Sequence, residues 1–212
     1  MKSYKYILLD WDGNLAKTLD VWLEAARTGL ESRGLHLSDE EIAWSFGNFT
    51  KYWQEWGITD VDAAFSEVDA LAKQKLPDVE LYPDTLEVLA GLHAAGKHLA
   101  LITSSLRNNV DHLLEKYDLA KFFEVIIAGE DITHHKPHPE ALEKGLKGLG
   151  GNKQEAIMIG DSDKDVLAAK NMGIDSILFY PDEHSKFYNF DRLRELGPTH
   201  IVKDMRRVLE IV

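Results

Sequence analysis

The sequence predicts an α/β fold built on a doubly wound, mostly parallel sheet, with a small all-helical segment inserted near the start of the chain. Three observations support this prediction. Tyr6–Leu9 is a short, continuous apolar run, as in a strand that is buried on both faces. After residue 83, strand and helix patterns alternate, which predicts parallel strands joined by right-handed crossovers. Between these regions, residues 16–83 show helical periodicity and no strand pattern.

The first predicted strand ends at a pair of acidic residues. Asp10 follows the apolar run directly, Asp12 comes two residues later, and Gly13 allows the backbone to turn with φ above zero. Ligands of open α/β sheets bind outside the carboxyl ends of the strands, which is where this order places both carboxylates. One carboxylate can attack a phosphorus atom while the other transfers a proton. An Asp-x-Asp alone is also compatible with two solvent-exposed loop acids. The motifs in the rest of the chain are needed to choose between this interpretation and a catalytic pair.

The inserted segment contains four predicted helices. Ser38-x-x-Glu41 is a capping-box pattern that opens the second helix, and Thr59-x-x-Asp62 opens the fourth. The helices are expected at residues 19–33, 38–46, 50–56 and 59–76. We therefore predict a core domain of residues 1–15 and 84–212 and a helical cap domain of residues 16–83.

The core domain alternates strands and helices after residue 83. Strands are expected at residues 98–102, 125–128, 156–159, 174–179 and 200–202, with helices at 84–95, 107–117, 140–149 and 166–172. Because the carboxyl ends of parallel strands lie along one edge of a sheet, polar residues that follow them can converge. Those that join Asp10 and Asp12 are Thr103 and Ser104, Lys136, and Asp161 with Asp165.

Composition limits the possible functions. The 212 residues carry a net charge of −12 and no run rich in lysine and arginine, which argues against nucleic-acid binding. A small phosphorylated substrate remains possible, because one metal ion and one lysine can reverse the local field. The chain has no cysteine, no signal-peptide pattern and no apolar run of membrane-spanning length. We expect a cytoplasmic monomer or homodimer that binds neither membranes nor nucleic acid.

Four motifs, in order, resemble those of the haloacid dehalogenase superfamily of phosphatases across essentially the whole chain. DWDGNL is similar to the first motif, DxDGT, and LITS to the second, a strand ending in Thr or Ser. The lysine of HHKPHPE is similar to the third motif, and GDSDKDVLAAKNMG to the fourth, GDxxxD followed by a helix. The helical insert resembles the cap of the phosphoglycolate phosphatase and β-phosphoglucomutase branch. The resemblance implies a Rossmann-like core and phosphatase activity.

The chemistry of the first and fourth motifs follows from their residue types. Asp10 would attack phosphorus to form an aspartyl phosphate, while Asp12 would protonate the leaving oxygen and later deprotonate the attacking water. Mg²⁺, which prefers oxygen ligands, would be held by Asp10, the main-chain carbonyl of Asp12 and Asp161. Asn14 stands where the family usually has Thr, and either residue can form a local hydrogen bond.

The second and third motifs supply groups for the phosphoryl oxygens. Lys136 would add a positive charge, and Thr103 and the Ser104 amide would donate hydrogen bonds. The resemblance gives Asp165 an indirect role, in holding Asp161 or Lys136. A first-turn acid that interacts favourably with its own helix is the alternative for Asp165.

Other residues are compared with those of the family that the chain resembles. A break between the cap helices resembles the substrate-reading loop, so Gly47, Asn48 and Lys51 are expected to contact substrate. Lys17, where the family often has Asp, would either join them or be solvated. Trp22 occupies the apparent position of a histidine in β-phosphoglucomutases, which argues against mutase chemistry.

Three histidines cluster in the third motif. His134, His135 and His138 suggest zinc by their proximity in sequence. Pro137 and Pro139 prevent the helix that would bring them to one face. We expect a solvated loop there rather than a metal site.

These expectations combine into one function. The predicted protein is a Mg²⁺-dependent phosphatase acting on a small phosphorylated metabolite, similar to phosphoglycolate or a sugar phosphate. Two alternatives remain open: a phosphomutase of the β-phosphoglucomutase type, or a catalytically idle protein that binds and regulates. The intact set of Asp10, Asp12, Lys136 and Asp161 argues against the second.

Overall fold

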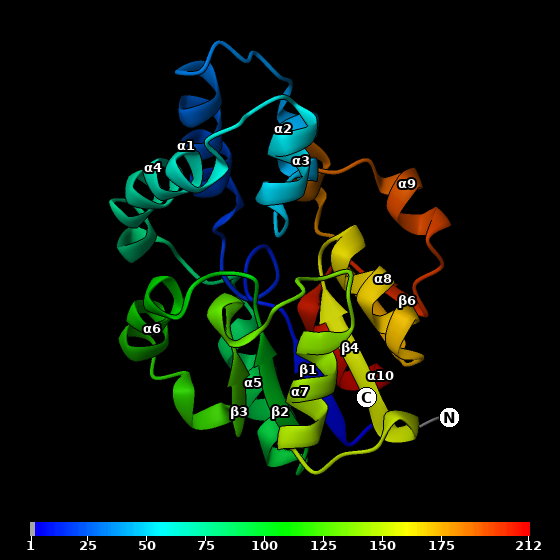
Figure 1. Ribbon diagram of the computed structural model, residues 1–212. Helices are drawn as coiled ribbons and strands as arrows, with labels where there is room; N and C mark the ends of the chain where they lie inside the picture. Colours follow the sequence, from blue (N-terminus) through cyan, green and yellow to red (C-terminus); the bar gives the residue numbers. More distant parts are fainter. Residues whose placement is uncertain (1–2) are drawn as a thin grey trace.

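Six parallel strands form one sheet in the order β3-β2-β1-β4-β5-β6, as the computed structural model shows for residues 3–212 (Figure 1). The strands are β1 (Tyr6–Leu9), β2 (His98–Ile102), β3 (Val125–Ile127), β4 (Ala156–Gly160), β5 (Asp175–Phe179) and β6 (His200–Val202). The strand order reverses direction between β1 and β4. Ligands of doubly wound sheets bind at such a switch point, and the predicted α/β fold class is confirmed.

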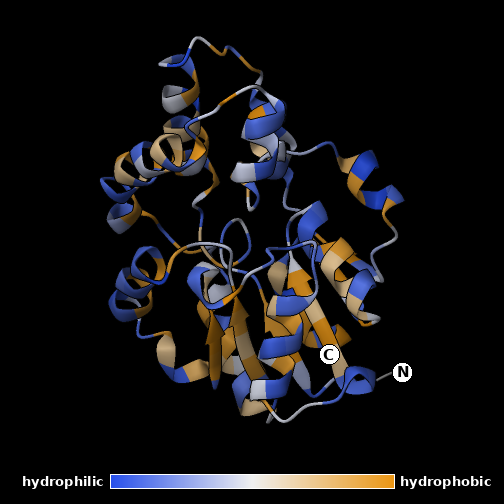
Figure 2. Cartoon of the chain, viewed as in Figure 1, coloured by the Kyte–Doolittle hydropathy of each residue, from blue (hydrophilic) through white to orange (hydrophobic). Residues whose placement is uncertain are grey.

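Helices cover both faces of the sheet because its strands alternate between two apolar clusters. Leu8, at the centre of β1, pairs with Ala100 and Met158 and packs with them against α7 (Glu140–Gly148) and α8 (Asp163–Met172). The neighbouring strand residues point to the other face. That face is covered by α5 (Thr85–Ala94), α6 (Arg107–Lys116) and α10 (Val208–Ile211). The strands are accordingly the most uniformly hydrophobic part of the chain (Figure 2).

Four helices lie above the carboxyl edge of the sheet (Figure 1). They are α1 (Leu19–Glu31), α2 (Asp39–Trp44), α3 (Phe49–Glu55) and α4 (Val61–Lys73). The predicted capping box of α2 is present, since Ser38 Oγ accepts from the amide of Glu41 while the Glu41 carboxylate accepts from the amide of Ser38. The capping pattern predicted at Thr59 is wrong. Asp60 precedes α4, and its side chain makes no capping bond to any described residue.

The two ends of this helical segment lie side by side. Ala16 and Leu81 form an antiparallel bridge, and the amide of Tyr82 donates to the carbonyl of Leu15 at 3.0 Å. A segment that leaves and returns at one place can be added to a fold without disturbing the sheet. This supports our proposal that residues 16–83 are a cap inserted into a core of residues 1–15 and 84–212.

Two α-helices in the described part of the chain lie outside the predicted elements: α10, which covers one face of the sheet, and a second helix that follows β5. α9 (Phe190–Glu195) follows β5 and stands beside α2 and α3 (Figure 1). The guanidinium of Arg192 lies 3.9 Å from the ring of Trp44 in α2, so α9 also contacts the upper helices. None of the helices within residues 3–212 has the length and apolar character that crossing a bilayer requires.

Candidate active site

A buried lysine joins two of the predicted acidic residues. The ammonium of Lys136 lies 2.7 Å from Asp10 Oδ1 and 2.6 Å from Asp165 Oδ1, and it also donates to the carbonyl of Ile102. All three charged side chains are buried. Burial lowers the pKa of Lys136, but the carboxylates of Asp10 and Asp165 outweigh that effect and hold it above its ordinary value. Lys136 is therefore a fixed positive charge at the end of β1.

The buried carboxylates around Lys136 carry more negative charge than this one lysine can offset. Burial raises the pKa of Asp10 to about 7; the carboxylate of Asp165 adds to this effect and Lys136 opposes it. Burial, followed by the charges of Asp165 and Asp10, likewise raises the pKa of Asp161 well above its usual range. Three buried carboxylates around one lysine leave a surplus of negative charge, which a divalent cation would offset.

The geometry fits a hard divalent cation at this place. Oxygens of Asp10, Asp161 and Asp165 lie within 4.8 Å of one another. Asp161 Oδ2 is buried and has no hydrogen-bond partner among residues 3–212, so it is available as a ligand. Both oxygens of Asp165 are engaged, one by Lys136 and the other by the amide and hydroxyl of Ser162. Asp165 thus contacts Lys136, one of the two partners that the family resemblance implies for it.

Gly13 brings the loop after β1 into contact with Asp161. Its φ is +73°, and a Cβ built on it would lie 2.3 Å from Asp161 Oδ2. Only glycine fits this close approach. The loop is held by Asn14, whose amide donates to the carbonyl of Asp10 at 3.0 Å, so the expected local bond of Asn14 is present. The loop that carries Asp12 and Gly13 is thereby kept close to Asp161.

The Asp12 side chain lies at the centre of a separate hydrogen-bond network. Its Oδ1 accepts from the Thr18 hydroxyl at 2.7 Å and from the Trp22 indole at 2.9 Å. Its Oδ2 accepts from the Ser105 hydroxyl at 2.7 Å and from the Thr103 hydroxyl at 3.4 Å. Sequence reasoning missed three of these partners. Ser105 directly follows the recognised motif, but nothing in the pattern indicates that Trp22 and Thr18 reach Asp12.

Of the predicted phosphate-binding residues, Ser104 is better placed than Thr103. The Thr103 hydroxyl accepts from the amide of Ser105 and contacts Asp12, so it organises the loop. Ser104 lines the cavity, and its buried hydroxyl has no partner within the described chain. A phosphoryl oxygen in the cavity would supply the missing partner.

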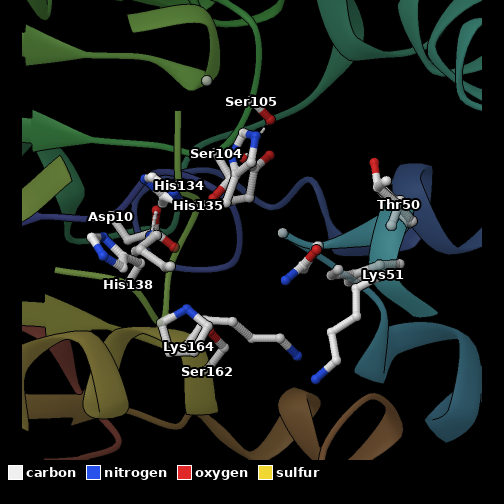
Figure 3. Close-up of a pocket in the computed structure, with 18 of the residues that line it drawn as sticks. Asp10, Thr50, Lys51, Ser104, Ser105, His134, His135, His138, Ser162 and Lys164 are labelled. Carbon is white, nitrogen blue, oxygen red and sulfur yellow. Dashed lines mark hydrogen bonds and ion pairs between the residues drawn. The ribbon is translucent and has the colours of Figure 1, made fainter. Parts of the chain in front are cut away.

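A cavity of about 1070 Å³ extends from these residues to the upper helices. In Figure 3, Asp10 and Ser104 lie on one side, and Thr50 and Lys51 of α3 lie on the other. Gly47, Asn48 and Lys51, which we expect to contact substrate, line this space. The volume exceeds what a phosphoryl group needs, so there is room for the rest of a substrate.

Lys164 was missed by sequence reasoning although it lines the cavity. It lies in the first turn of α8 and is buried. Its ammonium donates to the carbonyl of Trp44 at 2.6 Å and forms an ion pair with Asp163, 2.8 Å from Oδ1. Lys164 therefore connects the fourth motif to α2. Nothing in the GDxxxD pattern distinguishes a buried lysine at this position from a lysine exposed to solvent.

Lys17 corrects one expectation, since it lies outside the lining formed by the described residues. Its ammonium is 3.4 Å from Glu183 and 5.3 Å from the centre of the Tyr82 ring. The half-exposed ion pair matches the solvated alternative. The amide of Lys17 donates to the carbonyl of Glu80, so the lysine follows the returning segment of the chain beside Tyr82.

The histidines lie at the rim of the cavity. The rings of His134 and His138 are 4.6 Å apart, and the ligand atoms of these two residues and Glu140 lie within 4.8 Å of one another. The Glu140 carboxylate already accepts from the amides of Thr133 and His134 and from Lys144. This carboxylate therefore shapes the loop that carries Lys136.

A sequence profile described as haloacid dehalogenase-like hydrolase matches residues 7–179. The chain belongs to the haloacid dehalogenase-like hydrolase family. Pyrophosphatase PpaX of Halalkalibacterium halodurans is 34% identical over 134 residues, which cover 63% of this chain and 60% of that protein. Putative pyrophosphatase PpaX of Caldanaerobacter subterraneus subsp. tengcongensis is 33% identical over 209 residues, which cover 97% of this chain and 93% of that protein.

Two further family members differ in how far the likeness extends. Phosphoglycolate phosphatase of Salmonella typhi is 36% identical over 125 residues, which span 58% of this chain but only 47% of that protein. The crystal structure of a putative haloacid dehalogenase-like hydrolase from Bacteroides fragilis superimposes with a TM-score of 0.84 at 26% identity, covering 97% of this chain and all of the other. The likeness of fold therefore extends over nearly the whole chain, whereas the relatives themselves are named for two different substrates.

Proposed function

We propose that this protein is a Mg²⁺-dependent phosphatase that hydrolyses a small phosphate monoester through an aspartyl phosphate on Asp10. The observation that carries the proposal is the convergence of Asp10, Asp12, Lys136 and Asp161 from three loops at the switch point of the sheet. The family to which the chain belongs, and the phosphatase names of its relatives, support the same reaction class.

In the first step, an oxygen of Asp10 attacks phosphorus, the bond between phosphorus and the ester oxygen breaks, and Asp12 gives its proton to the departing oxygen. In the second step, water attacks phosphorus, its proton passes to Asp12, and the bond from Asp10 to phosphorus breaks, releasing phosphate. Lys136 and the Ser104 hydroxyl stabilise the charge on the phosphoryl oxygens. Bound Mg²⁺, held by Asp10, Asp161 and the carbonyl of Asp12, would reduce repulsion between carboxylate and phosphate.

The substrate proposed is a small phosphorylated metabolite. Phosphoglycolate and sugar phosphates are the leading classes of monoester. Pyrophosphate, an anhydride rather than an ester, is tested beside them because of the names of two relatives. A panel of these compounds, with phosphate release as the readout, tests the proposal. Release from none of them would favour a binding protein, and appearance of a phosphorylated isomer would favour a phosphomutase.

The metal ligands can be tested separately from activity. Chelator should abolish turnover and Mg²⁺ should restore it. Asp161→Asn should raise the Mg²⁺ concentration that gives half-maximal activity by at least about tenfold, since even residues behind the ligands contribute that much. Alanine at His134, His135 and His138 together should leave that concentration unchanged. The opposite pattern, in which the histidine variant loses its metal and Asp161→Asn keeps it, would show that the ligands are wrongly assigned.

Substrate discrimination should depend on the cavity wall formed by α3 and the preceding loop. Asn48→Ala and Lys51→Ala should change the ratio of kcat/KM for the best metabolite to that for p-nitrophenyl phosphate by more than about twofold, or 0.4 kcal/mol. Lys17→Ala is the matched control, since that lysine pairs with Glu183 outside the cavity. If Lys17→Ala changed the ratio and the other two did not, the substrate-reading role of this loop would be refuted.

A further inference from the structure

We propose that Trp22 is a positioning residue that fixes the Asp12 carboxylate for proton transfer. Trp22 lies in the first turn of α1, and its indole N–H donates to Asp12 Oδ1 across 2.9 Å. Asp12 lies in the loop after β1, so the bond connects the upper helices to the sheet. The inference rests on the proposed function, in which Asp12 is the acid and base.

The indole differs from the other donors to Asp12 in what it can do. The hydroxyls of Thr18 and Ser105 can rotate and can either donate or accept, whereas an indole N–H only donates. Trp22 therefore keeps Oδ1 in the role of acceptor. The opposite oxygen, Oδ2, contacts only the rotatable hydroxyls of Ser105 and Thr103 among the described residues, so it can carry the proton that the leaving group receives once these hydroxyls turn away. The bond thus selects both the orientation of the carboxylate and the oxygen that reacts.

Packing alone does not account for this bond. Trp22 is buried, and its ring lies 6.4 Å from that of Phe49 and lines the cavity. Trp53, in α3, is more deeply buried, and its indole nitrogen has no partner in the part of the chain that the structure describes. The same group of helices thus tolerates an unpaired indole, and Trp22 is the tryptophan whose N–H meets the predicted catalytic carboxylate.

The position of the bond also has a consequence for timing. Thr18 and Trp22 reach Asp12 from the start of α1, whereas Thr103 and Ser105 reach it from the loop after β2. Any displacement of α1 from the sheet would remove the two donors on Oδ1. Asp12 would then be correctly oriented only while α1 is packed against the edge of the sheet. Proton transfer would thereby be linked to enclosure of the substrate.

Two substitutions separate the hydrogen bond from the packing. Trp22→Phe keeps a six-membered ring and loses the donor. Trp22→His loses the six-membered ring but keeps an N–H in the same place, because imidazole Nε2 and indole Nε1 are each two bonds from Cγ in a five-membered ring. If the packing of the ring matters most, Trp22→His should lose more activity than Trp22→Phe. If the hydrogen bond matters most, Trp22→Phe should lose more activity than Trp22→His. Trp53→Phe is the matched control.

The readout is kcat/KM for two esters that differ in their need for an acid. The nitrophenolate of p-nitrophenyl phosphate departs readily without a proton, whereas the alkoxide of glycerol phosphate requires one. Trp22→Phe should lower kcat/KM for glycerol phosphate by a factor at least about tenfold larger than the factor for p-nitrophenyl phosphate. Trp22→His should recover most of that difference, and Trp53→Phe should leave the ratio of the two substrates unchanged.

The proposal is overturned if Trp22→Phe lowers kcat/KM equally for both substrates. It is also overturned if the ratio of the two kcat/KM values is no closer to wild type in Trp22→His than in Trp22→Phe. Should Trp22→Phe fail to fold, benzothienylalanine at this position keeps the ring shape with sulfur in place of N–H, and the same ratio decides. Asp12→Asn, assayed in parallel, isolates the underlying function. If it retains activity on glycerol phosphate, the acid assignment is wrong; if it loses activity while the Trp22 variants do not, only the role of Trp22 fails.

Discussion

Asp10→Asn should lower kcat/KM by at least about 10⁴-fold, because the amide cannot form the acyl phosphate through which both steps pass. The fold should survive. Burial raises the pKa of Asp10 to about 7, so its charge is unfavourable in the folded protein, and Lys136 retains Asp165 as a partner. The free energy of unfolding should therefore stay within about 1 kcal/mol of the wild-type value or rise.

Phosphate release and thermal unfolding, measured on the same preparation, test this prediction. Asn14→Ala is a useful companion, because it removes the side-chain bond to the Asp10 carbonyl while leaving the carboxylate intact. It should retain far more activity than Asp10→Asn. Near-wild-type turnover by Asp10→Asn would eliminate Asp10 as the nucleophile.

Lys136→Met should reduce both stability and activity. Methionine fills much of the volume of the lysine stem but leaves Asp10 and Asp165 buried without the cation that joins them. Removing one partner of a buried ionic group costs about 3–5 kcal/mol. Activity should fall at least about 100-fold, because a charge that faces the phosphoryl oxygens is lost.

The stability loss is measured by denaturant unfolding in the presence of chelator, so that Mg²⁺ cannot replace the missing charge. Lys144→Met is the matched control in the same region. Lys144 is half-exposed and pairs with Glu140, and its loss should cost less than about 1 kcal/mol. Adding Asp165→Asn to Lys136→Met should restore part of the stability and none of the activity. Equal losses for Lys136→Met and Lys144→Met would contradict the buried network.

The sheet and its polar edge were predictable because their signals are local. A buried strand such as Tyr6–Leu9 shows itself as an apolar run, and the residues that follow parallel strands must share an edge. Hence the arrangement of Asp10, Lys136 and Asp161 follows from their order along the chain and the direction of the strands.

The contacts between the upper helices and this edge could not be predicted in the same way. The bond from Trp22 to Asp12 and the bond from Lys164 to Trp44 depend on how α1 and α2 are seated over the sheet, which no periodicity encodes. Lys17 shows the opposite error, because proximity in sequence to the first motif does not place a side chain in the cavity.

The most direct test of the central claim is to identify the phosphorylated residue. Wild-type protein is mixed with p-nitrophenyl phosphate and Mg²⁺, quenched in acid within the first turnover, digested and examined by mass spectrometry. We expect a phosphoryl group on the peptide that contains Asp10, labile to hydroxylamine as an acyl phosphate is, and missing from Asp10→Asn. Rapid phosphate release with no phosphorylated peptide, or with the group on another residue such as His135, would contradict it.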